Sequence, residues 1–475
     1  MHFSIPDTQE LKEANGSTFI GYNIHINGAF HCTLRYKQMH NLNEQLKKEF
    51  ANDYLPPFPP KKLLPLTSGQ LEERRILLEK YIQTVGQDSK FVSSELLCGF
   101  FLSAQQESSR KRETYVNLKI YTFNYYPVKT RIRITTSSFD STEKVLIKTL
   151  KQINLPIEYN QYFSLYLIKI ENSSDIVVVR KLFDFESPYL TQQVLRSPTK
   201  IVIRKSYWDT IYDNEIMKDP VALNLLYKQI LSEIERGSIH TTPPIKVQLE
   251  KLKLRLAKKE YILFAQKQKD YGFMQFAQCY SDFPKPQTKV SVAIGDKELR
   301  IRLLDQFLYA EDAFKVTRMR CWRITTTNNK SPIHLENGHS TQVPSNLELS
   351  FEYLKSKDKL EWITINSDQA ILMSVCLRSL VEELLMKKNG FKKPNSFKSS
   401  RKWTYMKRDG TCQCITINND LNNSDDQGSQ SDHSYAAQEP FSMKTLQENF
   451  SSVLFKNGRE FIENHAFEGI GDEDL

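Results

Sequence analysis

The length of the chain limits its fold, because a single hydrophobic core rarely grows beyond about 250–300 residues. The chain has 475 residues, so we expect several domains with separate cores. It is 40% hydrophobic and 25% charged, as is usual for folded proteins. Its net charge of +9 is a mild surplus, so the placement of the basic residues matters more than their sum.

Several classes of protein are disfavoured. The seven cysteines are scattered and odd in number, which predicts reduced thiols rather than a disulfide framework. Cys412 and Cys414 are close together but lack further ligands at metal-binding spacing, so we expect no metal. The N-terminal residues do not resemble a signal peptide, and no apolar run approaches a membrane span. Phosphate-binding and hydrolase motifs are missing, so we expect no catalytic residues, no enzyme activity and no cofactor.

Strand and helix patterns divide the chain into four folded units and a tail. The first mixes strands, with a hairpin-like Asn27-Gly28, and helices. The second has a ubiquitin-like order of two strands, a helix and more strands, the third is helical, and the fourth is β-rich with one closing helix. The tail is polar and is expected to be disordered. The predicted boundaries are 1–109, 110–205, 206–272, 273–390 and 391–475.

Two basic clusters flank a proline run, PPFPPKKLLPL from Pro56, in the first unit. Arg35 at a strand end can bind a phosphate with two hydrogen bonds, and Tyr36 can lie under a flat ring. The stiff proline run can fix Lys61, and Arg74 can close the site from the next helix. Taken singly, these residues are equally consistent with surface charges beside a linker. Together they predict a site for a phosphorylated headgroup, next to an apolar membrane wedge of Leu63, Leu64 and Leu66.

These features resemble the phox-homology domain of the sorting nexins: strands ending in Arg-Tyr, a proline run ending PPKKL, and EERR before an apolar helix. The resemblance implies binding of phosphatidylinositol 3-phosphate by Arg35, Tyr36, Lys61 and Arg74, with Lys62 beside them. Lys37 departs from the family, which usually has a small hydroxyl residue there. An extra cation there can add a phosphate contact or loosen the preference for the 3-phosphate.

The next three units, in their order, resemble the FERM-like module of sorting nexins that also carry a phox-homology domain. The segments YFSLYLI, KSYWD, VTRMRCWR and FEYLKSKDKLEW support this resemblance. It implies a monomeric cytoplasmic cargo adaptor on the cytoplasmic side of early endosomes, peripherally bound. Nucleic acid is not expected as a partner, because the basic residues are dispersed.

The helix expected at 368–388 carries two apolar stripes. Met373, Leu377, Leu380 and Leu384 form the expected core face, and Val381 and Leu385 lie about 90° round the helix. These two are also consistent with a broad core face, and Trp322 with an ordinary core residue.

The resemblance implies that Val381, Leu385, Trp322 and Leu354 line a groove for a peptide, and strand alternation places Arg320 on the same face as Trp322. Its ligands would be unphosphorylated Asn-Pro-x-Tyr or Asn-x-x-Tyr motifs in the tails of lipoprotein receptors and integrin beta subunits.

The acidic C-terminal end also carries apolar residues. Phe467, Ile470 and Leu475 are interspersed with Asp472, Glu473 and Asp474, which suits a basic-rimmed groove that reads a free chain end. The family resemblance implies that this groove belongs to the Retriever recycling complex. A tail that only aids solubility is the simpler alternative.

Two other functions remain consistent with a FERM-like module. One is a link between membrane and cytoskeleton, although the short acidic end does not resemble an actin-binding helix. The other is an effector of Ras-like GTPases, for which KTRIRIT in the second unit offers a basic strand.

Overall fold

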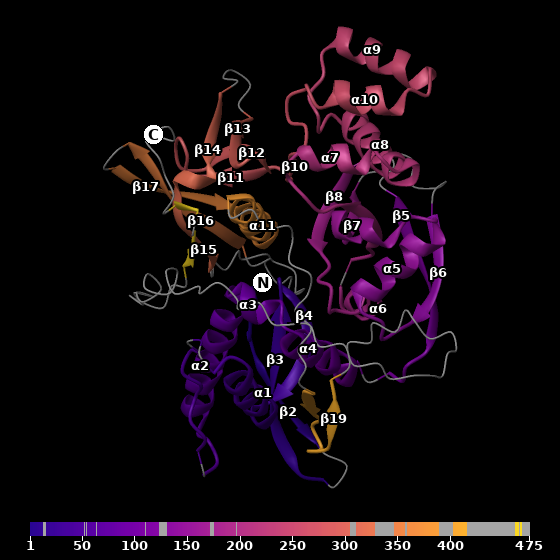
Figure 1. Ribbon diagram of the computed structural model, residues 1–475. Coiled ribbons are helices and arrows are strands. Elements are labelled where there is room, and N and C mark those ends of the chain that lie inside the picture. Colours follow the sequence, from indigo (N-terminus) through magenta and orange to yellow (C-terminus); the bar gives the residue numbers. More distant parts are fainter. Residues whose placement is uncertain are drawn as a thin grey trace, which may run out of the picture.

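The computed structural model has four folded units, as expected, and two short C-terminal pieces that fold onto them (Figure 1). The structure describes residues 1–12, 16–51, 53, 55–62, 64–109, 111–122, 131–171, 175–195, 197–304, 310–327, 346–356, 359–388, 402–415, 461–464 and 466–467. No helix in these ranges is long and apolar enough to cross a bilayer.

The first unit is an antiparallel sheet covered by helices. Its strands β3 and β4 meet at Asn27-Gly28, whose φ angles of 50° and 77° suit the tight turn predicted from the sequence. Strand β3 also pairs with β1 and β2. Its elements are β1 (Phe3–Ser4), β2 (Thr8–Lys12), β3 (Thr18–Ile26), β4 (Ala29–Arg35), α1 (Tyr36–Glu49), α2 (Ser68–Gln87), α3 (Ser89–Val92) and α4 (Glu95–Ser108).

The second unit is a five-stranded sheet of order β6-β5-β9-β7-β8, in which β5 and β9 run parallel. One hydrophobic cluster joins this sheet to the third unit. The second unit contains β5 (Tyr115–Thr122), β6 (Arg131–Ser137), α5 (Thr142–Gln152), η1 (Ile157–Tyr162), β7 (Phe163–Glu171), β8 (Asp175–Lys181), α6 (Pro188–Val194) and β9 (Lys200–Lys205).

The third unit is helical. Its longest helix, α8, begins with Pro220 after the N-cap Asp219 and ends before Gly237, which has a φ of 74°, so the sequence signals for both ends are confirmed. The unit contains α7 (Ile211–Ile216), α8 (Pro220–Glu235), α9 (Pro243–Leu254) and α10 (Lys258–Ala265).

The fourth unit is a β-sheet closed by α11 (Ala370–Lys388). Met373, Leu377 and Leu380 are buried in its core, which confirms the predicted core face of the helix. The other elements are β10 (Met274–Gln275), β11 (Cys279–Ser281), β12 (Thr288–Gly295), β13 (Glu298–Leu303), β14 (Glu311–Lys315), η3 (Val316–Arg318), β15 (Met319–Thr327), β16 (Asn346–Ser356) and β17 (Lys359–Asn366).

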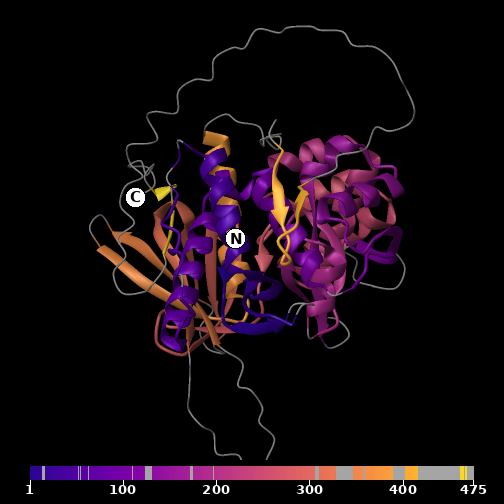
Figure 2. The same ribbon diagram turned by 90° about the horizontal axis from the view of Figure 1, so that it is seen from below.

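The expectation that the whole tail is disordered is wrong for two segments. Strands β18 (Thr404–Met406) and β19 (Cys412–Cys414) form a hairpin that packs against α1 and α4 of the first unit. Strand β20 (Ile462–Glu463), yellow in Figure 2, adds to the edge of the fourth unit's sheet beside β15. Both segments depend on contacts with distant residues, which a local reading of polarity does not detect.

Helix α11 also bridges to the first unit. The Arg378 guanidinium donates to the Gly86 carbonyl at 3.3 Å and to the Gln87 carbonyl at the end of α2. The Met1 amino group donates to the same Gly86 carbonyl at 3.2 Å. Burial lowers the pKa of that amine to about 4, so it is neutral near pH 7. Arg378 is therefore the cation that binds the C-terminal carbonyls of α2. The C-terminal end of a helix carries partial negative charge, which favours a cation there.

Two glycines of α2 provide a matched test of this packing. A Cβ at Gly86 would lie 2.4 Å from Cδ2 of buried Phe3, so Gly86→Ala should destabilise the first unit by about 1–3 kcal/mol. A Cβ at Gly69 would meet nothing within 4 Å, so Gly69→Ala should be neutral or stabilising by up to about 1 kcal/mol. Urea denaturation measures both, and equal effects would contradict the close packing at Gly86.

Candidate functional site

Arg35 lies where β4 becomes α1 in the first unit. The side chain of Gln38 accepts from the Arg35 backbone N–H at 2.9 Å, which fixes the start of the helix. The Arg35 guanidinium stacks over the Phe19 ring, 4.1 Å from its centroid. A phosphate-binding side chain is thus held at a strand–helix junction.

The proline run is pinned to α1 by aromatic side chains. The Tyr36 hydroxyl donates to the Pro59 carbonyl at 2.7 Å, and the Phe58 ring lies 5.6 Å from the Tyr36 ring and 4.9 Å from that of Tyr81. Burial raises the pKa of Tyr36, so its hydroxyl remains a neutral donor. These contacts hold the segment that carries Lys61 next to the ring of Tyr36.

Arg74 comes to the same ring from α2. Its guanidinium carbon lies 4.5 Å from the Tyr36 centroid. Its Nε and Nη2 are buried and have no hydrogen-bond partner among the described residues. Because buried guanidinium donors without acceptors are costly, an anionic ligand is the natural partner for them.

The other predicted lipid-site residues lie around this centre. Lys37 and Lys61 are exposed, and Lys62 is 3.7 Å from the Glu73 carboxylate. Arg35 thus precedes Tyr36 in the chain, Arg74 packs on the ring of Tyr36, and Lys61 and Lys62 follow the segment that is bonded to its hydroxyl. In the expected wedge, Leu64 is 80% exposed and Leu66 is half-buried. Leu63 lies outside the described residues.

The second candidate site is the edge of β15 that lies beside α11. Trp322 is 1% exposed, and its indole N–H donates to the Ser374 hydroxyl of α11 at 2.9 Å. Val381 is buried in the same cluster, and Leu385 packs against it. Trp322 is therefore a core residue that joins the edge strand to the helix.

The chain itself occupies this edge. Ile462 lies opposite Trp322, and Glu463 lies opposite Cys321. The amide side chain of Asn464 donates to the carbonyls of Val316 and Met319, both at 2.7 Å.

A tight turn follows the paired residues. The Asn464 side chain accepts from the Ala466 N–H at 3.0 Å, and its carbonyl accepts from the Phe467 N–H at 3.0 Å. An extended strand that ends in an Asn-anchored turn before an aromatic residue is thus a ligand that this edge accommodates.

Arg320 and Leu354 are placed differently from the other predicted groove residues. The register shifts between Met319 and Cys321, and the Arg320 guanidinium pairs with Glu352 of β16. Arg320 contributes its carbonyl instead, which accepts from the Asn464 N–H at 3.1 Å. Leu354 lies on β16 opposite Leu360, at the end of the strand that contacts η3.

Of the predicted partner-binding tail, Phe467 is described and half-buried. Ile470, Asp472, Glu473, Asp474 and Leu475 lie outside the described residues. The Asn-His-Ala-Phe run at 464–467 was missed in the sequence, although its spacing imitates the expected Asn-x-x-Tyr ligand.

Comparison with known proteins accounts for all four units. Residues 22–104 match the PX domain model, and 116–208 match the sorting nexin 17/27/31 FERM domain, F1 lobe. Residues 209–269 match the sorting nexin 17/31 FERM domain, F2 lobe, and 272–385 match the Sorting Nexin 17 FERM C-terminal domain.

Curated relatives are similar to this chain over its full length. The chain is 42% identical to sorting nexin-17 of Danio rerio over 482 residues and 42% identical to that of Homo sapiens over 504 residues, covering 100% of each chain. The chain belongs to the sorting nexin 17 family. Human sorting nexin-31 is 32% identical over 390 residues, with 82% of this chain and 86% of that protein covered. The sorting nexin 17 family consists of endosomal trafficking adaptors rather than enzymes.

The contacts of Asn464 give the first prediction at this site. Asn464→Ala removes two buried hydrogen bonds of about 1 kcal/mol each, so the tail segment should leave β15 roughly 30-fold more often. Hydrogen exchange of the amides at 462–464 and along β15 measures this opening. Glu463→Gln is the control, because Glu463 is exposed, and its exchange should match that of the unmodified chain. Unchanged protection in Asn464→Ala would mean that other contacts hold the segment.

Proposed function

We propose that this sorting nexin is an adaptor that binds phosphatidylinositol 3-phosphate through its first unit and receptor tails through its fourth. The receptor motifs are Asn-Pro-x-Tyr or Asn-x-x-Tyr, and the outcome is recycling of lipoprotein receptors and integrins from early endosomes to the plasma membrane. The observation that carries the lipid part is Arg74, whose buried Nε and Nη2 have no acceptor among the described residues. The observation that carries the peptide part is the strand seated on β15.

The lipid site combines the groups that an inositol phosphate needs. Arg35 offers a planar fork of donors for a phosphate, and the Tyr36 ring offers a flat surface for the sugar. Arg74 places Nε and Nη2, which have no partner in the described part of the chain, beside that ring, and Lys61 adds an exposed charge. Leu64 is exposed close by, at the place where an apolar side chain can enter the bilayer.

The peptide site would recognise the backbone and the asparagine side chain of its ligand more than the ligand's charge. Two carbonyls that bind the side chain of Asn464 would bind the asparagine of a receptor motif in the same way. Arg320 is already paired with Glu352, so a phosphate on the motif's tyrosine gains no cation from it. A receptor tail must displace residues 461–467 to bind, and this displacement releases the chain's own C-terminal end.

The released end would then be available to the Retriever complex through Phe467, Ile470 and the acidic residues up to Leu475. Lipid, cargo and Retriever each bind one part of the same chain. Because the three sites are on one chain, binding at one site raises the effective concentration of the partners at the other two. Three weak affinities can therefore combine into stable binding at a membrane.

Removal of either half-buried arginine tests the lipid site. Arg35→Ala and Arg74→Ala should each weaken binding by at least about tenfold, because a hydrogen bond to a charged group contributes about 1.5–3 kcal/mol. Co-sedimentation with phosphatidylcholine vesicles, with and without phosphatidylinositol 3-phosphate, measures the effect. Lys47→Ala is the charge-matched control, since Lys47 pairs with Glu44 on the exposed surface of α1. Full binding by both arginine variants would refute the assignment.

Competition for the groove tests the peptide site. Asn464→Ala should bind an Asn-Pro-x-Tyr peptide more tightly than the unmodified chain, because its internal competitor is weakened. Titration calorimetry measures the affinity, with Glu463→Gln as the control and a tyrosine-phosphorylated peptide expected to gain nothing. Equal or weaker binding by Asn464→Ala would show that the peptide binds elsewhere.

A further inference from the structure

The hairpin of β18 and β19 lies more than 290 residues from the first unit in sequence, yet it is part of that unit's core. Trp403 is 7% exposed and Tyr405 is 1% exposed, and both belong to the same hydrophobic cluster as the helices of the first unit. Ile415 approaches α4 so closely that a Cβ at Gly99 would lie 2.0 Å from its Cγ2. The hairpin and the first unit lie side by side in both ribbon views (Figures 1 and 2).

Directional hydrogen bonds also hold the hairpin. The Gln45 side chain both donates to the Thr404 carbonyl at 2.8 Å and accepts from the Thr404 N–H at 3.0 Å. Gln38 donates to the Met406 carbonyl at 2.9 Å. This pairing fixes the register of β18 against α1, which apolar contact alone would not do.

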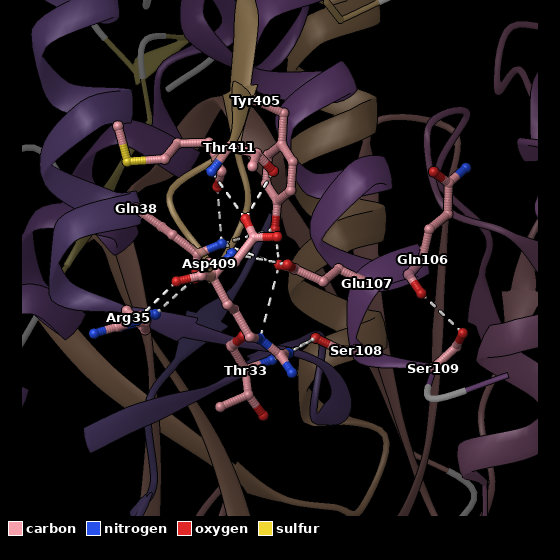
Figure 3. Close-up of polar contacts among 12 residues, drawn as sticks. Thr33, Arg35, Gln38, Gln106, Glu107, Ser108, Ser109, Tyr405, Asp409 and Thr411 are labelled. Atoms are coloured by element: carbon pink, nitrogen blue, oxygen red, sulfur yellow. Dashed lines mark hydrogen bonds and ion pairs between the residues drawn. The ribbon is translucent and has the colours of Figure 1, made fainter. Parts of the chain in front are cut away.

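Glu107 of α4 fixes the start of the hairpin's turn (Figure 3). Its carboxylate accepts from the Tyr405 hydroxyl at 2.6 Å and from the Arg408 N–H at 2.8 Å. The Arg408 guanidinium donates to the Thr33 carbonyl at 2.9 Å and to the Ser108 hydroxyl at 2.6 Å. The backbone at Arg408 is therefore held against β4 and α4.

The turn of the hairpin contacts Arg35, the first residue of the proposed lipid site. The Arg408 carbonyl accepts from Nη1 of Arg35 at 2.7 Å, while the Phe19 ring supports the guanidinium at 4.1 Å from its centroid. Nearby, Nζ of Lys37 lies 3.7 Å from the position of a Cβ at Gly410. The turn thus contacts Arg35 and passes beside the cation that departs from the family pattern.

A restrained arginine binds phosphate better than a free one. A long side chain loses rotamer entropy when it is immobilised by a ligand, and prior restraint removes much of that cost. A guanidinium has five N–H donors, so one backbone acceptor at Nη1 does not by itself prevent a phosphate from binding. The contact is therefore compatible with headgroup binding and favours it.

We propose that residues 402–415 form a structural part of the phosphoinositide site, in which the hairpin turn positions Arg35 for its phosphate. The inference rests on the proposed lipid function and extends it to a segment outside the phox-homology domain. Arg408 is a positioning residue that acts through its carbonyl group. An anionic headgroup thus binds a site assembled from both ends of the chain.

The decisive variant changes the conformation of the hairpin turn and does not alter the buried side chains of Trp403 and Tyr405. Gly410 has a φ of 89°, which a β-branched residue does not adopt, so Gly410→Val should displace the turn while Trp403 and Tyr405 stay packed. Cys412→Ser is the matched control, because Cys412 is exposed on the same hairpin. Both are made in the full chain and compared with it by titration with inositol 1,3-bisphosphate, the soluble headgroup.

We expect Gly410→Val to bind the headgroup about tenfold more weakly with an unchanged melting temperature, and Cys412→Ser to bind normally. A second variant, Tyr405→Ala, should detach the hairpin, and a synthetic peptide of residues 402–415 added in trans should restore its binding. Normal binding by Gly410→Val and Tyr405→Ala would overturn the inference and leave the lipid function standing. Failure of the unmodified chain to bind the headgroup would overturn both.

Discussion

The contact between Arg378 and the end of α2 connects the two proposed binding sites. Helix α2 carries Arg74 in its first half and ends at the carbonyls that Arg378 binds. Helix α11 carries Arg378 and, one turn earlier, Ser374, which holds Trp322 of the groove. The lipid site and the groove are therefore joined through two helices and one guanidinium.

The C-terminal region completes both sites with pieces of the same chain. Trp403, Tyr405 and Ile415 pack into the core of the first unit, and Ile462 and Glu463 pair with β15 of the fourth. The first piece is anchored by buried aromatic rings, and the second by the hydrogen bonds of Asn464 together with half-buried side chains such as Ile462. The difference predicts a lasting structural role for the hairpin and an exchangeable role for the segment on β15.

Local signals account for what the sequence predicted correctly. The turn at Asn27-Gly28, the ends of α8 and the core face of α11 each depend on residues close together in the chain. The basic cluster was recognised because its residues match a known family. Its unpaired donors on Arg74 were not predictable, because they depend on how α2 packs over Tyr36.

The missed features depend on distant partners. Asp409-Gly410 is a hairpin signal, but β18 and β19 are three residues each and are too short to be stable without α1 and α4. The altered position of Arg320 follows from a shift in register between Met319 and Cys321, which a strict alternation along the strand does not anticipate. Asn464 becomes a ligand only when η3 and β15 bring two carbonyls together.

The bridge made by Arg378 has a geometric consequence for cargo. If the first unit is held at the bilayer, the groove stays at a set height above it, because α2 and α11 fix the spacing. A receptor tail then needs a spacer between its membrane span and its motif, and each extended residue provides at most about 3.3–3.6 Å of reach. Receptors with the same motif would therefore be sorted by the length of chain that precedes it.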